Sequence, residues 1–213
     1  SGFSEAHLRG SDPVGWRSPS SIAVEAAAQV RAGERFVYCY YNGVDKIAHE
    51  RGFGDFYDAE LRFADALVAD LIATVPAGTA VLVTADHGQV HVGDRVVYPS
   101  SELLGRVTMQ SGEGRFRWLH CAATDIEGLV DAAESEVGDV AWVVSKEQML
   151  DEGWFGPTVS PPIQRRLGDV ALCAYEPVSF FEAADSGPFE LVCRHGSMTS
   201  AEVNVPLLGT FVG

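Results

Sequence analysis

The first part of the chain contains two kinds of apolar pattern: continuous apolar runs, and apolar side chains repeated at helical spacing. Residues 36–41 (FVYCYY) and 80–85 (AVLVTA) are continuous apolar runs, which are typical of strands buried on both faces of a parallel sheet. Residues 55–75 instead repeat apolar side chains at helical spacing and predict an amphipathic helix. The order strand, helix, strand predicts an α/β crossover unit.

The flanking segments extend this prediction. Residues 1–21 are rich in Gly, Ser and Pro and predict a loop, and residues 22–32 predict a helix that stops at Gly33. Between 93 and 189 the pattern predicts an inserted α+β lobe beside a core made of residues 1–92 and 190–213. The lobe's expected elements are a hairpin around 111–114, a helix at 125–137, a strand at 140–144, a capped helix at 145–153, a loop at 154–162 and a strand at 169–175.

After this lobe the chain is expected to return to the main sheet. Residues 190–194 (ELVCR) predict a strand of that sheet. Thr199 and Glu202 have the spacing of a capping box at the start of a helix.

Composition narrows the classes of partner. The chain of 213 residues has 46% apolar and 21% charged residues, as a globular protein with a real core does, and no apolar run long enough to cross a bilayer. Its net charge of −15 argues against a nucleic-acid or anionic-membrane surface as partner, because such a partner requires a basic patch. The four cysteines lack C-x-x-C spacing and predict buried thiols in a reducing, cytoplasmic setting.

Candidate chemistry follows three expected strands at their carboxyl ends. The motifs are Asp45-x-x-x-His49, Asp86-His87-Gly88 and His195-Gly196. Each has an ordinary explanation on its own: an ion pair on a helical turn, a polar turn, or a loop histidine. Together they lie where open α/β sheets gather their ligands, so we interpret them as one site.

The five acidic and imidazole side chains of this site can hold two divalent metal ions. Asp45 and His49 lie on one face of a helical turn, and His195 completes a three-ligand set with an open position, as in catalytic zinc sites. Asp86 and His87 would hold the second ion. Zinc is expected because three of the five ligands are imidazoles, and a two-metal centre predicts hydrolysis of a phosphate or related ester.

Three further residues have weaker support. Arg115 and Arg117 flank the predicted hairpin and are expected to be solvated, with a phosphate-clamp role as the alternative. His91 is expected in a surface loop, although it is close enough in sequence to Asp86-His87 to reach a substrate. No Ser, Thr or Cys has an equally convincing setting for a nucleophile.

Three stretches carry a family resemblance: VYCYYNGVDKIAHERG, VLVTADHG and CRHGSMTSAEVNVPLLG. They resemble, in order, motifs of the alkaline phosphatase superfamily, in its type I phosphodiesterase/nucleotide pyrophosphatase branch. The resemblance implies a three-layer α/β/α sandwich with a mostly parallel sheet, truncated at its N-terminus. It also implies one zinc on Asp45, His49 and His195 and another on Asp86 and His87, with substrates that are phosphate esters or nucleotides.

The same resemblance implies a phospho-enzyme formed on a Thr or Ser, and a further Asp ligand, which both lie in an N-terminal part that this chain lacks. No catalytic nucleophile is therefore assigned to this chain, and the isolated chain is expected to be inactive. An uncovered sheet edge would then favour a homo-oligomer or association with the missing segment.

Other functions remain open at this stage. The same metal pair could serve phosphomonoester hydrolysis, phosphonate cleavage or a mutase. A non-catalytic, metal-stabilised domain and a doubly wound domain with incidental histidines are the non-enzymatic alternatives.

Overall fold

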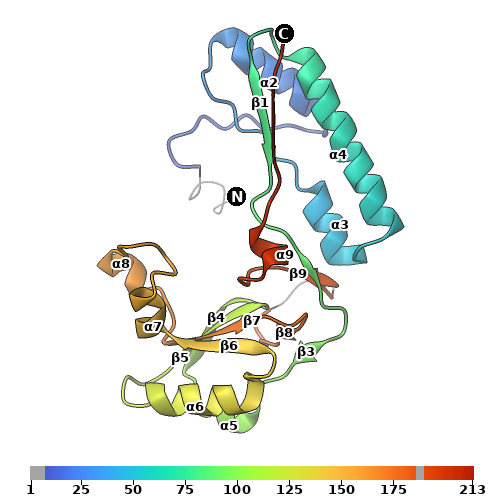
Figure 1. Ribbon diagram of the computed structural model, residues 1–213. Helices are drawn as coiled ribbons and strands as arrows, with labels where there is room; N and C mark the ends of the chain where they lie inside the picture. The colour runs from blue at the N-terminus through green and yellow to red at the C-terminus, as the bar shows by residue number, and fades with distance from the viewer. Residues whose placement is uncertain (1–7, 186–189) are drawn as a thin grey trace. The chain divides into compact units, whose positions relative to one another are not determined.

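The computed structural model describes residues 8–185 and 190–213, drawn as a ribbon in Figure 1. Spatial contacts divide the chain into two compact units. The first contains the described residues up to Val44, together with Ala59–Val83 and Leu208–Gly213. The second contains Asp45–Asp58 and Thr84–Leu207. The predicted division into a core and a lobe at residues 93–189 stays a prediction.

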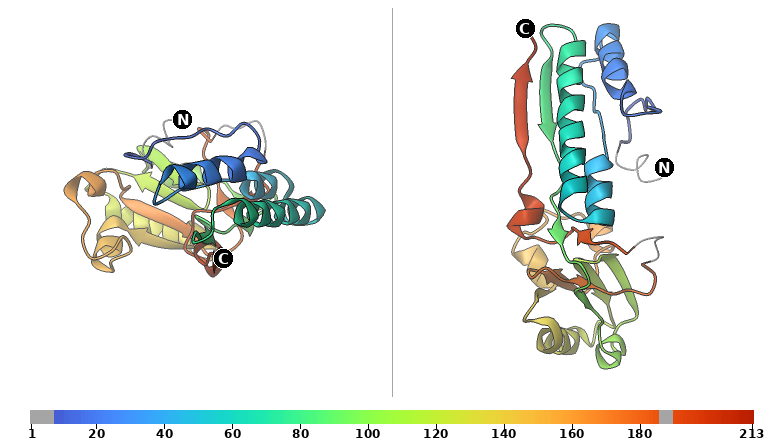
Figure 2. Two further views of the ribbon diagram at one scale, coloured as in Figure 1. Left: turned by 90° about the horizontal axis from the view of Figure 1, so that it is seen from above. Right: turned by 90° about the vertical axis from the view of Figure 1, so that its right-hand side faces the viewer.

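The first unit packs helices against a pair of strands. Its helices are α2 (Ser21–Ala32) and most of α4 (Asp55–Thr74), and its strands are β1 (Ala80–Thr84) and β10 (Leu207–Phe211). β1 and β10 pair with each other and run in opposite directions (Figure 2). Beyond the strand ends, the Gly78 amide donates a hydrogen bond to the Val212 carbonyl at 2.8 Å, which extends the pairing. The predicted helices and the predicted strand at 80–85 are therefore confirmed.

Gly33 ends α2 as the sequence predicts. Its φ of 100° lies in the left-handed region, where a residue with a Cβ is disfavoured. The core of this unit centres on Ala27, Val75 and Val81.

The prediction of a buried strand at residues 36–41 is wrong. The segment forms no regular secondary structure, and the side chains of Phe36 and Tyr38 are 83% and 56% exposed. A continuous apolar run becomes a buried strand only where neighbouring strands and two covering layers exist, and the described residues provide none for this segment. Leu82 of β1 is also exposed, so this unit presents uncovered apolar side chains. The self-association expected from such a surface stays a prediction.

The second unit contains a four-stranded antiparallel sheet in the order β4-β5-β7-β6. Its strands are β4 (Met109–Glu113), β5 (Phe116–His120), β7 (Val170–Ala174) and β6 (Ala141–Ser145). The helix α6 (Ile126–Val137) lies along one face of this sheet (Figure 1), where Leu129, Ala133 and Val137 are buried. The hairpin, the helix at 125–137 and the two strands predicted here are confirmed.

Short helices complete this sheet region. They are α5 (Ser101–Leu104), α7 (Lys146–Asp151) and α8 (Pro161–Gln164). α7 is the predicted capped helix, because the Ser145 side chain accepts a hydrogen bond from the Gln148 amide.

The remaining elements carry the candidate ligands or lie beside them. They are α3 (Gly43–Arg51), α9 (Ser200–Val203) and the strands β2 (Val90–His91), β3 (Val96–Val97), β8 (Ser179–Phe180) and β9 (Cys193–Arg194). β2 pairs antiparallel with β9, and β3 pairs parallel with β8. The expected return of residues 190–194 to the main sheet is wrong, because β9 pairs with β2 instead. Helices and mixed sheets together confirm the α/β class.

The cysteines are free thiols, as expected from their spacing. Cys173 and Cys193 are buried and Cys121 is half-buried, but Cys39 is exposed because it lies in the segment 36–41, which forms no strand. The burial expected for Cys39 is therefore wrong. In the part of the chain that the structure describes, no helix has the length and hydropathy needed to cross a bilayer.

Candidate metal centre

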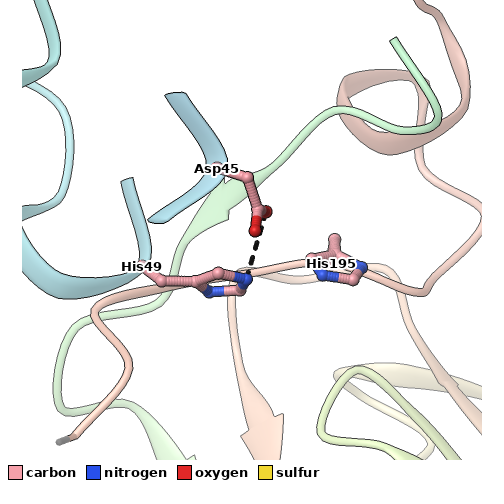
Figure 3. A group of neighbouring side chains, drawn as sticks. All are labelled: Asp45, His49 and His195. Atoms are coloured by element: carbon pink, nitrogen blue, oxygen red, sulfur yellow. Dashed lines mark ion pairs between the residues drawn. The ribbon is translucent and has the colours of Figure 1, made fainter. Parts of the chain in front are cut away.

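Helix α3 places Asp45 and His49 on one face. Residues four apart on a helix lie one turn above each other, and His49 Nε2 is 3.2 Å from Asp45 Oδ1 (Figure 3). The helical turn predicted from Asp45-x-x-x-His49 is therefore confirmed.

His49 is oriented by the strand that carries the third candidate ligand. Its Nδ1 donates to the Cys193 carbonyl at 2.6 Å, and the Val192 amide donates to the His49 carbonyl at 2.7 Å. A carbonyl oxygen can only accept, so Nδ1 carries a proton and Nε2 faces Asp45. The hydrogen bond to Asp45, followed by the bond to Cys193, raises the pKa of His49 even though burial opposes this.

His195 follows β9 and joins the same cluster. Asp45, His49 and His195 are half-buried, and each offers a ligand atom that lies within 4.8 Å of the other two (Figure 3). Burial, followed by the nearby His87 and His49 rings, lowers the pKa of His195 to about 4. The ring is therefore neutral near pH 7, which is the form that binds a metal ion.

Asp86 and His87 lie in the bend after β1, next to the same cluster. The His87 ring stacks on the His195 ring with 3.6 Å between centroids, and His87 Nδ1 lies 2.9 Å from the Gly88 carbonyl. His87 Nε2 lies 3.7 Å from Asp86 Oδ1. The cluster of three described above includes neither residue, so their role at a second ion stays a prediction.

A buried ion pair connects the loops that carry the candidate ligands, and sequence reasoning missed it. Arg115, fully buried, donates from Nε and Nη2 to the two carboxylate oxygens of Glu202, both at 2.8 Å. Glu202 also accepts from the Ser197 amide at 2.9 Å, two residues after His195. Its backbone carbonyl accepts from the Gly88 amide at 2.8 Å, next to His87. Glu202 therefore joins both ligand-bearing loops.

These contacts correct two predictions. Arg115 and Arg117 are 0% and 1% exposed, so the prediction that they are solvated is wrong. The helix predicted to start after Thr199 is confirmed as α9, but its capping box is wrong, because the Thr199 hydroxyl donates to the Glu202 carboxylate instead of accepting from its amide. Burial raises the pKa of Glu202, but hydrogen bonds from Arg115 and Thr199 outweigh it and lower the pKa overall. No local sequence signal pairs residues 87 positions apart.

The other candidates lie outside this arrangement. Arg117 donates to the Phe180 carbonyl at 3.2 Å and forms an ion pair with Asp185. His91 is exposed in β2, where its ring lies 6.4 Å from that of Phe53. The expectation of a surface position for His91 is confirmed, although the residue belongs to a short strand.

Gly88 allows the close approach between the two loops. A Cβ atom at this position would lie 2.0 Å from the Ala201 carbonyl oxygen, which is far inside contact distance. We expect Gly88→Ala to lower the free energy of unfolding by about 1–3 kcal/mol, because the backbone must move apart. Gly15→Ala is the control, since its Cβ would meet nothing within 4 Å. Urea unfolding of the two variants measures the difference, and equal stabilities would show that the contact is not tight.

An α/β chain that gathers a carboxylate and two imidazoles at one point has a candidate metal site of the kind found in hydrolases. A family model for type I phosphodiesterase / nucleotide pyrophosphatase matches residues 12–198. The chain belongs to this family. Among curated proteins, none matches the sequence.

Solved structures show the same fold at low sequence identity. Mouse ectonucleotide pyrophosphatase / phosphodiesterase 5 aligns with a TM-score of 0.68 and 14% identity over 93% of this chain and 54% of its own. The human counterpart has a TM-score of 0.66 and 12% identity over the same shares. Phosphonoacetate hydrolase from Sinorhizobium meliloti 1021 has a TM-score of 0.53 and 19% identity over 78% of this chain and 43% of its own. The chain thus spans about half the length of the structures it matches most fully.

Proposed function

We propose that this chain forms the metal-binding part of a metal-dependent phosphoesterase that hydrolyses phosphodiesters or nucleotide pyrophosphates. One observation carries the proposal: Asp45, His49 and His195 come from two segments far apart in sequence, and their ligand atoms lie within 4.8 Å of one another. Family membership supports the reaction class.

The donor set fits zinc. Two imidazoles and one carboxylate are ligands that zinc accepts, and a three-ligand set leaves a position for substrate or water. His49 is held by the Cys193 carbonyl through Nδ1, so Nε2 is the nitrogen available to a cation. We propose Asp86 and His87 as ligands of a second ion, because the His87 ring stacks on His195.

The ions would supply local positive charge in a chain whose net charge is negative. A divalent ion polarises a phosphoryl oxygen and lowers the pKa of a bound hydroxyl. The net charge of −15 repels a phosphate ester at long range, so attraction has to be local. Asp45, His49 and His195 would orient that charge within a half-buried site.

The nucleophile is not assigned to any residue of this chain. We propose a Thr or Ser hydroxyl elsewhere in the protein, which would form a phospho-enzyme that water then hydrolyses. A structure of the mouse relative, described as an inactive threonine-to-alanine variant in complex with AMP, supports a hydroxyl in that role and a nucleotide as ligand. Activity is accordingly proposed for the whole protein.

Cleavage of a phosphonate is the second candidate reaction. The similarity to phosphonoacetate hydrolase favours it, although at a lower TM-score of 0.53. Parallel assays with a nucleotide diester, a phosphomonoester and phosphonoacetate separate these reactions.

Metal removal tests the proposal. We expect full-length protein treated with a chelator to lose hydrolysis of a p-nitrophenyl nucleotide diester, and added Zn²⁺ to restore it. Circular dichroism before and after chelation serves as the control for folding. Undiminished turnover in protein that mass spectrometry shows to be free of metal would contradict a metal-dependent reaction. Loss of the fold without any measurable turnover of the intact protein would favour a metal-stabilised domain instead.

A further inference from the structure

Gln89 lies against the candidate metal ligand Asp45, and nothing in the sequence motifs draws attention to it. Its Nε2 donates to Asp45 Oδ1 and, at 3.3 Å, to the Asp45 backbone carbonyl. Gln89 directly follows Asp86-His87-Gly88, so the loop with the second pair of candidate ligands reaches back to the first set.

The orientation of this amide is determined by its partners. Both Asp45 atoms are oxygens without a proton, so the NH₂ group has to face them and Oε1 has to face away. Oε1 is buried and has no hydrogen-bond partner among the described residues. Both donors of this amide are therefore directed at Asp45, while its acceptor has no partner in the described part of the chain, so the contact with Asp45 is what orients the Gln89 side chain.

The contact with Gln89 also occupies one of the two carboxylate oxygens of Asp45. Oδ1 accepts from Gln89 and lies 3.2 Å from His49 Nε2. The bond to the Asp45 carbonyl holds the amide on the helix backbone, so the carboxylate cannot rotate without losing the bond from Nε2. Hydrogen bonds to ligating carboxylates orient the ligand, and their removal typically weakens metal affinity 10–100-fold.

From these contacts we infer that Gln89 is a positioning residue, which fixes the Asp45 carboxylate for one metal ion and ties that site to the loop of the second. The inference rests on the proposed metal-dependent function. It assigns Gln89 no contact with substrate.

Two variants separate hydrogen bonding from space filling. Gln89→Met keeps the side-chain volume but removes the donor. Gln89→Glu is nearly isosteric and places a carboxylate against the Asp45 carboxylate. The matched control is Gln110→Met in β4, because Gln110 is also half-buried with an unpaired buried Oε1 but is recorded in no contact with the candidate ligands.

The measurement is Zn²⁺ affinity of the full-length protein, by competition with a chromophoric chelator, together with the urea midpoint of each variant. We expect Gln89→Met to weaken one of the two bound ions about 10–100-fold and leave the other unchanged. Gln110→Met should bind both ions as the wild type does. Gln89→Glu should differ from Gln89→Met, since its carboxylate repels Asp45 or ligates the ion itself.

Each of the other outcomes contradicts either the inference about Gln89 or the proposed function. Wild-type affinities in both Gln89 variants would overturn the inference alone, because they would show that side-chain volume suffices. Equal weakening of both ions, or equal losses in the Gln110 control, would show a general structural effect and also overturn it. A wild-type protein that binds no Zn²⁺ would refute the proposed function itself.

Discussion

Replacement of His195 by alanine is expected to lower kcat/KM for phosphodiester hydrolysis by about 10³-fold or more, equivalent to about 4 kcal/mol of transition-state stabilisation. His195 is the candidate ligand that comes from outside α3, so its loss leaves Asp45 and His49 as the remaining pair of the cluster. Loss of its ring also removes the surface on which His87 stacks. The measurement is steady-state kinetics of full-length protein at saturating Zn²⁺.

His91→Ala is the matched control for this variant. His91 lies in β2 directly opposite Cys193 of β9, and it is exposed. We expect its kcat/KM to stay close to that of the wild type. If both variants retained wild-type kinetics, the cluster would not be the catalytic centre. If both lost activity equally, disturbance of the β2–β9 pair would explain the effect instead.

Replacement of Arg115 by methionine is expected to lower the free energy of unfolding by about 3–5 kcal/mol, because it leaves the Glu202 carboxylate charged, buried and without its cationic partner. The guanidinium also donates to the carbonyls of Glu176 and Val178, at 2.9 and 2.8 Å, and these acceptors would lose a donor. Urea unfolding at neutral pH provides the measurement.

An exposed ion pair provides the comparison for Arg115. Arg106 lies 2.6 Å from Asp125, with side chains 39% and 34% exposed. Arg106→Met should change the free energy of unfolding by at most about 1 kcal/mol, since water screens such a pair. Similar losses in both variants would mean that burial adds nothing to the Arg115–Glu202 pair. The double variant Arg115→Met/Glu202→Met should recover part of the loss, because it removes the unpaired charge.

Local patterns predicted the elements whose stability depends on their own residues. The helix over 55–75 follows from apolar side chains at helical spacing, and the end of α2 follows from Gly33. The hairpin around 111–114 follows from its turn residues. These elements need few distant partners, so their sequences suffice to predict them.

Predictions that depended on distant partners were less successful. The burial of 36–41 requires strands and layers that the run itself does not specify, and Phe36 is exposed. The sequence predicts a surface position for Arg115, because arginine is rarely buried without a partner. Its partner, Glu202, lies far along the chain. Charge and spacing within a hairpin do not reveal such a partner.

The features of the candidate site also differ in whether the sequence alone predicts them. The proximity of Asp45 and His49 follows from helical geometry. The position of His195 beside them does not follow from the predicted main-sheet strand, because His195 comes after β9, which pairs antiparallel with β2. The bonds that orient these ligands could not be predicted, since they involve the Cys193 carbonyl and the Gln89 amide, which belong to no motif.

The most direct measurement is a crystal structure of the full-length protein loaded with Zn²⁺, with anomalous data collected at the zinc edge. The account predicts a peak bonded to Asp45, His49 and His195, with zinc–nitrogen distances of about 2.0–2.1 Å, and a second peak beside Asp86 and His87. Zinc bound at other residues, or no anomalous peak among these three side chains, would contradict it.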